Sequence, residues 1–172
     1  RSDTGHDDII TLATFIKKSE LKIIIHVIGG GALFEKFIAK ISKYNLDNVI
    51  KTYGHIEHIK AMSMLDNMDV GISTSPIEMM PNFILECFSL GVPVLGYITQ
   101  GIEDLIIDNV NGCLCEIGDV EGMFDQLSAL AINSNKLKQL ASEALSSSDE
   151  YTPKNIGVKI SSFYNKVKGV AC

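Results

Sequence analysis

Short apolar runs that alternate with helical segments constrain the fold of this chain more than any other feature of its sequence. The runs are rich in β-branched residues, and most are apolar nearly throughout, as in strands that are covered on both faces. This alternation is typical of a doubly wound α/β domain with a Rossmann-like parallel sheet, helices on both faces and right-handed crossovers. Predicted strands cover residues 21–28, 49–53, 69–73, 92–97 and 113–115, and predicted helices cover residues 32–44, 56–68 and 81–90.

The pattern becomes purely helical after residue 118. Three amphipathic segments follow, at residues 120–131, 135–147 and 153–167. No linker, repeat or low-complexity tract interrupts the 172 residues, and a length of this order suits one domain. We therefore predict a single domain over residues 1–172, with a helical tail from about residue 119.

Composition excludes several classes of function. The formal net charge of −6 argues against non-specific binding to nucleic acid, which relies on clustered Lys and Arg. No apolar run approaches the roughly 18 residues that a membrane-spanning helix needs. Cys113 and Cys115 are predicted to share one face of a strand, and their spacing is not that of a zinc finger. We therefore expect reduced core thiols and no bound metal.

Glycines follow two of the predicted strands, at the carboxyl ends where α/β sheets bind ligands. Gly29, Gly30 and Gly31 allow close backbone approach and offer amides to an anion, although a plain turn is an equally good interpretation. Their spacing is not G-x-G-x-x-G, so NAD binding is not indicated. Gly54 closes the next strand. Residues 99–104 add a glycine next to acids at a helix start, for which ordinary capping is the alternative.

Two glutamates stand out in the apolar stretch of residues 75–96. Glu86 is predicted in the second turn of a helix that is apolar on every side, where an unpaired carboxylate costs free energy. A ribose would suit Glu86, because a carboxylate can accept from two vicinal hydroxyls. Glu78 lies in the preceding loop, within reach of a sugar beyond the diphosphate. The alternatives are a carboxylate stabilised by the helix dipole at Glu86 and a solvated loop acid at Glu78.

The same helix is predicted to begin with an anion-binding end. Pro81 is expected in its first turn, where the fixed φ fits and the missing N–H is no loss. The free amides of Asn82, Phe83 and Ile84 then carry a partial positive charge suited to a phosphate. Together with the two glutamates, these groups would bracket a nucleotide sugar.

The segment Glu78-x7-Glu86 followed by the GVPV stretch at residues 91–94 resembles a known signature. It is similar to the E-x7-E motif of retaining glycosyltransferases with two Rossmann-like domains (the GT-B fold, group 1), in their C-terminal, nucleotide-sugar-binding domain. The glycine loops, the two glutamates and Asn111-Gly112 occur in the family's order, so that the resemblance covers most of residues 5–118.

The resemblance implies roles for individual residues. Glu86 would hold the ribose hydroxyls and Glu78 the hydroxyls of the donor sugar, as the catalytic glutamate. Backbone amides would hold the diphosphate, and the backbone near Ile56 would meet the base. The donor-binding residues so implied are Gly29, Gly30, Gly31, Gly54, Ile56, Met80, Pro81, Asn82, Phe83 and Glu86.

The resemblance also implies an activity, namely transfer of a hexose-type sugar with retention from a nucleoside diphosphate sugar to a glycan, lipid or other acceptor. No metal or other cofactor is expected, since cationic side chains and amides stabilise the leaving diphosphate. The acceptor would bind a separate N-terminal domain of a longer parent protein. That protein would be cytoplasmic, and its peripheral association with the inner face of the membrane is left open. Alternatives of the same fold are a sugar-nucleotide epimerase, a phosphorylase-like enzyme, and a non-catalytic binding module. Met79, where the family usually has Gly, and Thr4, where it has Lys, favour the non-catalytic module.

By the same resemblance, the first strand of the family's domain lies upstream of Arg1 and belongs between residues 21–28 and 69–73. Leaving its place empty would bury unpaired backbone groups, each costing roughly 1–3 kcal/mol. Residues upstream of Arg1, a segment of another chain, or direct pairing of the two flanking strands could fill or close it. We expect upstream residues.

Overall fold

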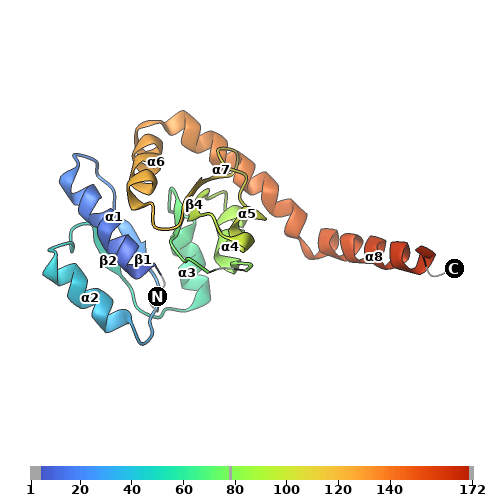
Figure 1. Cartoon of the computed structure of the whole chain (residues 1–172), viewed down its shortest axis with the longest axis horizontal. Helices are drawn as coiled ribbons and strands as arrows, with labels where there is room; N and C mark the ends of the chain where they lie inside the picture. Colours follow the sequence, from blue (N-terminus) through green and yellow to red (C-terminus); the bar gives the residue numbers. More distant parts are fainter. Residues whose placement is uncertain (1–4, 78, 171–172) are drawn as a thin grey trace.

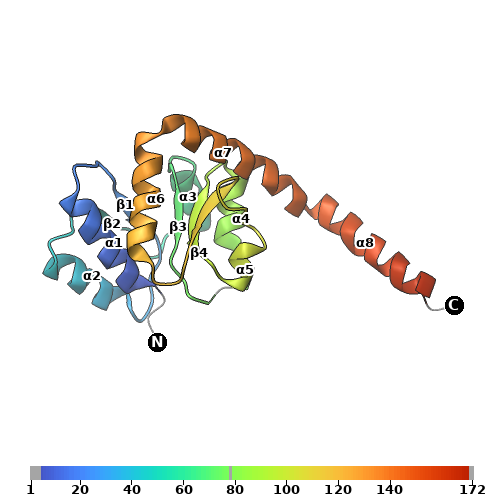
Figure 2. The same cartoon turned by 45° about the horizontal axis from the view of Figure 1, so that its top comes forward.

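The computed structural model describes residues 5–77 and 79–170, with residues 167–170 described by their backbone alone. Short parallel strands lie at the centre with helices on both sides of them (Figures 1 and 2). The chain ends in one long helix that projects away from the rest of the molecule (Figure 1).

Every strand and helix predicted from the sequence is present, in the predicted order, although the ladders are shorter than the apolar runs. The strands are β1 (Ile25–Val27), β2 (Ile50–Thr52), β3 (Gly71–Ser73), β4 (Val94–Tyr97) and β5 (Gly112–Cys115). The helices are α1 (His6–Lys18), α2 (Phe34–Lys43), α3 (His58–Leu65), α4 (Asn82–Ser89), α5 (Gln100–Glu103), α6 (Val120–Ile132), α7 (Ser134–Ser148) and α8 (Pro153–Val170), with the 3-10 turn η1 (Asp149–Tyr151) before the last.

Helix α1 was not predicted. Its sequence nevertheless carries the usual marks of a helix, because Ile10, Ala13 and Ile16 recur at helical spacing and are all buried. Acidic residues occupy its first turn and lysines occupy its last turn, which is the arrangement that the helix dipole favours.

The strands form two separate parallel sheets. One joins β1 to β2, with Ile25 opposite Ile50, and the other has the order β3-β4-β5. In the second sheet Val94 lies opposite both Gly71 and Gly112. No ladder joins β1 to β3 in the described part of the chain. The prediction of a parallel, helix-flanked sheet is thus confirmed, whereas direct pairing of residues 21–28 with 69–73 is not observed.

Two hydrophobic clusters cover opposite faces of the strands. The first lies under α1 and α6 and joins helix residues such as Leu12 and Met123 to residues of both sheets such as Ile25 and Leu95. The second lies between the β3-β4-β5 sheet and helices α4, α5 and α7, with Phe88 at its centre. The first cluster therefore ties the two sheets together, although no strand ladder joins them among the described residues.

Three cysteines belong to these clusters. Cys87, Cys113 and Cys115 are free and buried, so the prediction of core thiols is confirmed for them. Burial raises the pKa of Cys87 to about 12, with a further rise from the charge of Glu86. Burial likewise raises the pKa of Cys115 to about 11, aided by the charge of Asp119.

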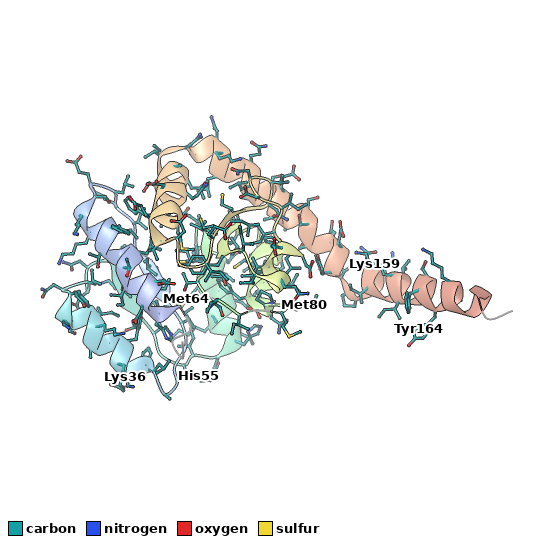
Figure 3. The ribbon with its side chains drawn as sticks, viewed as in Figure 1. Lys36, His55, Met64, Met80, Lys159 and Tyr164 are labelled. Carbon is teal, nitrogen blue, oxygen red and sulfur yellow. The ribbon has the colours of Figure 1, made fainter. Side chains whose placement is uncertain are left out.

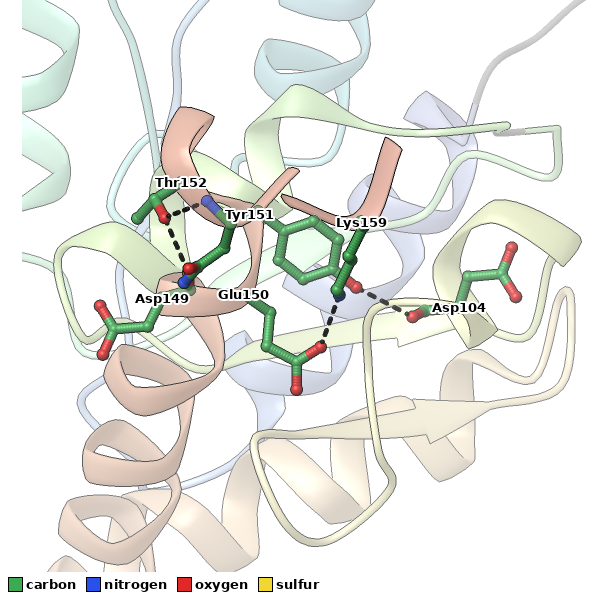
Figure 4. A network of polar contacts seen from close by, with 7 residues as sticks. Asp104, Asp149, Glu150, Tyr151, Thr152 and Lys159 are labelled. Atoms are coloured by element: carbon green, nitrogen blue, oxygen red, sulfur yellow. Dashed lines mark hydrogen bonds and ion pairs between the residues drawn. The ribbon is translucent and has the colours of Figure 1, made fainter. Parts of the chain in front are cut away.

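The tail is held to the body near η1. Figure 4 shows the Tyr151 hydroxyl donating to the backbone oxygen of Asp104 at 3.3 Å. In the same network Lys159 of α8 pairs with Glu150 of η1 at 3.1 Å. Within the described residues, no helix is both long and apolar enough to cross a membrane.

Candidate functional site

The glycine loops after β1 and β2 lie side by side. The Gly29 amide donates to the Gly54 oxygen at 2.8 Å, and a Cβ on Gly30 would lie 3.7 Å from the His55 nitrogen. Figure 3 labels His55 at this pair of loops and Met80 at the loop that follows β3, and both side chains are exposed. Because all strands within each sheet are parallel, these loops share the carboxyl ends of the strands, as predicted.

The turn at Gly29 and Gly31 requires glycine. Both residues have φ of 137°, which side-chain-bearing residues rarely adopt, and a Cβ on either would meet nothing within 4 Å. Their backbone is therefore open to an approaching ligand.

Helix α4 begins one residue later than predicted. Pro81 is its N-cap, in extended conformation with φ of −74° and ψ of 112°, rather than a residue of its first turn. The Ile84 amide donates to the Pro81 oxygen at 3.0 Å, so Ile84 does not supply a free amide. The N-cap residue Pro81 makes no side-chain capping hydrogen bond. The amides of Asn82 and Phe83, which precede the first intrahelical donors, remain for an anion.

Helix α4 is buried on one face only, which corrects the prediction of burial all round. Ile84, Cys87 and Phe88 lie against the second cluster, whereas Asn82 and Phe83 are exposed. The apolar sequence suggested full burial, but Phe83 is 37% exposed. The Glu86 side chain, on this same helix, is 36% exposed.

Glu86 faces the start of α3. Its Oε1 lies 4.0 Å from Nδ1 of His58, whose side chain is 71% exposed. The sequence analysis missed His58, which is the first residue of α3 and lies two residues after Ile56, because its contact with Glu86 depends on how α3 and α4 lie. This contact places the loop after β2, which contains the half-buried Ile56, next to α4.

The loop after β3 also meets the loop after β4. Gly101, buried in α5, approaches the backbone of Met79 so closely that a Cβ would lie 2.1 Å from the Met79 oxygen. Thr99 is the N-cap of α5, yet its hydroxyl makes no capping hydrogen bond and is buried without a hydrogen-bond partner among the described residues. The capping interpretation of residues 99–104 therefore does not hold for the Thr99 side chain.

The start of helix α1 also contacts a loop at the carboxyl ends of the strands. The buried Thr74 hydroxyl donates to the Gly5 oxygen at 3.0 Å, so α1 starts beside the carboxyl end of β3. Gly5 has φ of 69° and a Cβ there would collide with Thr74, so only glycine fits.

The remaining predictions for the site concern Met80, Glu78 and a bound metal. Met80 is 59% exposed in the loop before α4. Glu78, the predicted catalytic residue, lies outside the described residues. The described residues contain no cluster of three or more His, Cys, Asp or Glu that could hold a metal.

The glycosyl transferases group 1 model matches residues 1–146. The chain belongs to this family. It is 34% identical over 101 residues to the lipopolysaccharide 1,6-galactosyltransferase of Escherichia coli K12, covering 57% of this chain and 28% of that protein. It is 26% identical over 139 residues to the poly(ribitol-phosphate) alpha-N-acetylglucosaminyltransferase of Staphylococcus aureus, covering 80% of this chain and 28% of the relative. The chain thus spans well under half of these relatives.

Solved structures agree on the fold. The crystal structure of TarM from S. aureus superposes with a TM-score of 0.85 at 24% identity, over 96% of this chain and 33% of TarM. The C-terminal domain of a group 1 family protein (LpcC) from Francisella tularensis superposes with a TM-score of 0.77 at 21% identity, over 91% of this chain and 82% of that domain. The group 1 glycosyltransferase chain therefore has the fold of a GT-B C-terminal domain, as the resemblance implied.

Proposed function

We propose that this chain is the donor-binding part of a retaining, metal-independent glycosyltransferase that uses a nucleoside diphosphate sugar. The observation that carries the proposal is the position of Glu86. Its partly exposed carboxylate follows the two open amides of α4 along one helix, next to His58 and the loop after β2. That spacing suits the ribose and the diphosphate of one ligand.

Each group has a separate task in this proposal. The Glu86 carboxylate accepts hydrogen bonds from two ribose hydroxyls. The amides of Asn82 and Phe83 donate to the diphosphate and stabilise it as the leaving group. The backbone at Ile56 meets the base, and the open turn at Gly29–Gly31 borders the diphosphate and the sugar.

UDP is the nucleotide to test first. The HepE protein of Anabaena, with a TM-score of 0.78 at 19% identity, has been crystallised with UDP-glucose. TarM has been crystallised with UDP. We extend this donor class to the present chain, with a hexose-type donor sugar. A glycan or lipid acceptor would be bound by another part of the full-length protein, and the protein would act at the inner face of the membrane.

The test is calorimetric titration of the full-length protein with UDP, GDP and ADP and with their sugars. Replacing Glu86 by Ala removes a charge-assisted hydrogen bond, which is worth roughly 1.5–3 kcal/mol, or about ten- to a hundred-fold in affinity. Glu143→Gln, on the exposed surface of α7, is the matched control and should bind as the wild type does. A folded Glu86→Ala variant with unchanged nucleotide affinity would show that the ribose assignment is wrong.

Glu78 is tested in the same titration. We propose that Glu78 contacts the donor sugar, so Glu78→Ala should weaken the nucleotide sugar and leave the free nucleoside diphosphate unaffected. Equal losses for both ligands would contradict this division of roles.

A further inference from the structure

Helix α3 turns one of its faces towards helix α4. Leu65, at the end of α3, is partly buried against the second cluster, which also contains Ile84 and Phe88 of α4. His58 lies seven residues before Leu65, close to two turns of an α-helix, so both side chains lie on the same face of α3. The packing of Leu65 therefore helps to fix where His58 stands relative to α4.

His58 is the residue through which α3 reaches the Glu86 carboxylate. Its Nδ1 lies 4.0 Å from Oε1 of Glu86. Within the described residues, the Glu86 carboxylate has no other hydrogen-bond or ion-pair partner. The His58 side chain is largely exposed and that of Glu86 is partly exposed, so a ligand can reach both of them.

The stability of α3 itself does not explain a histidine at this position. His58 is the first residue of α3, where the helix dipole favours an acid and disfavours a positive charge. The first turn contains no acidic residue, and the N-cap residue Glu57 makes no side-chain capping hydrogen bond. The polar contact that the imidazole makes is with Glu86, on the neighbouring helix.

We propose that His58 is a positioning residue that holds the Glu86 carboxylate in the orientation that receives the ribose. The proposal rests on the proposed function, because it takes Glu86 as the ribose-binding group. A small rotation of either side chain brings Nδ1 of His58 to hydrogen-bond length from Oε1, and contacts in unliganded sites often tighten in this way when the ligand binds. Each carboxylate oxygen can accept two hydrogen bonds, so Oε1 accepts from His58 and from one ribose hydroxyl while Oε2 accepts from the other hydroxyl.

This contact lowers the entropic cost of binding the donor. A glutamate side chain without a partner samples several rotamers and loses that freedom when it binds a ligand. Ordering one such side chain in advance is worth roughly two- to tenfold in affinity. The effect of His58 on a ligand should therefore depend on Glu86 and on the ribose hydroxyls that Glu86 binds.

A double-mutant cycle on the full-length protein tests the proposal. The ligand is whichever of UDP, GDP and ADP binds most tightly, titrated by calorimetry into the wild type, His58→Leu, Glu86→Ala and the double variant. His58→Leu should weaken binding roughly two- to tenfold when Glu86 is present, and by less than about twofold in the Glu86→Ala background. Equal losses in the two backgrounds would overturn the proposal, because His58 would then act independently of Glu86.

A conservative variant and a modified ligand separate positioning from a purely structural role. His58→Asn places an amide donor where Nδ1 stands, so its affinity should return to within about twofold of the wild type. The dideoxy analogue of the same nucleotide lacks both ribose hydroxyls, so the wild type and His58→Leu should bind it equally. A loss for the dideoxy analogue as large as the loss for the natural nucleotide would overturn the proposal.

The same titrations distinguish this inference from the proposed function. If Glu86→Ala weakens binding and His58→Leu does not, the positioning role of His58 is wrong and the ribose assignment stands. If Glu86→Ala itself leaves the affinity unchanged, both the ribose assignment and the role of His58 are wrong.

Discussion

Replacing Gly101 by Ala perturbs the candidate site through one defined contact. The added Cβ would lie 2.1 Å from the Met79 oxygen, about 0.9 Å inside the 3.0 Å below which real Cβ contacts essentially never fall. The obstructing atoms belong to the Met79 backbone, so no side-chain rotation relieves the collision. The loop that leads into α4 must therefore move away from α5.

The free-energy cost of Gly101→Ala should appear partly as lost stability and partly as weaker donor binding. Overpacking costs typically about 1–3 kcal/mol, offset by roughly 0.5–1 kcal/mol from replacing a helical glycine by alanine. The loop can yield, because Met79 is 87% exposed. We therefore expect at most about 2 kcal/mol of lost stability, a fall in Tm of no more than about 4–8 °C at this chain length. Donor affinity should fall at least about tenfold, because the displaced loop carries the start of α4.

Gly96→Ala is the matched control for this prediction. Its Cβ would meet only side-chain atoms, of Ile102 at 3.4 Å and of Ile106 at 3.7 Å, so stability and affinity should stay close to wild type. Thermal unfolding and calorimetric titration of the full-length variants measure both quantities. If Gly101→Ala bound UDP within twofold of wild type, the loop would not control the site and the reasoning would fail.

Two further predictions follow from the chain's extent and from its thiols. Residues 1–172 alone should transfer no sugar, because catalysis needs an acceptor aligned with the donor, and turnover by this piece at the rate of the full-length enzyme would contradict that. The folded pKa values of Cys87 and Cys115, about 12 and about 11, lie above the ordinary value of 9.0. Their contribution to stability is therefore complete below pH 9 and lost as the pH rises from 9 towards 12. Urea unfolding at pH 8 and pH 10.5 should show lower stability at the higher pH, with a smaller drop in Cys115→Ala.

The sequence predicted the elements well because their periodicity is local. The apolar runs at residues 21–28 and 92–97 each contain a strand of the predicted sheet, and the ladders are shorter only because hydrogen bonding depends on the neighbouring strand. Helix α1 was missed although Ile10 and Ile16 carry a helical pattern that could have been read. The burial of α4 was overestimated because composition does not show which face another element covers.

Only those parts of the site that are marked by loops and glycines could be predicted from the sequence. The glycine turn and the start of α4 were placed correctly at the carboxyl ends of the strands. The contacts of Gly5 with Thr74 and of Gly101 with Met79 join residues far apart in sequence, so no spacing rule reveals them. His58 was missed for the same reason, since its approach to Glu86 depends on how α3 and α4 lie.

Helix α3 shows why local pattern and tertiary packing must be compared. Its sequence is apolar at Ile59, Met62 and Leu65, the spacing of a helix that packs on a sheet, yet none of these side chains is buried. Leu65 is partly buried against the second cluster, whereas Ile59 is 79% exposed. The apolar spacing therefore predicts the helix, but which of its apolar side chains another element covers depends on tertiary packing that the local pattern does not contain.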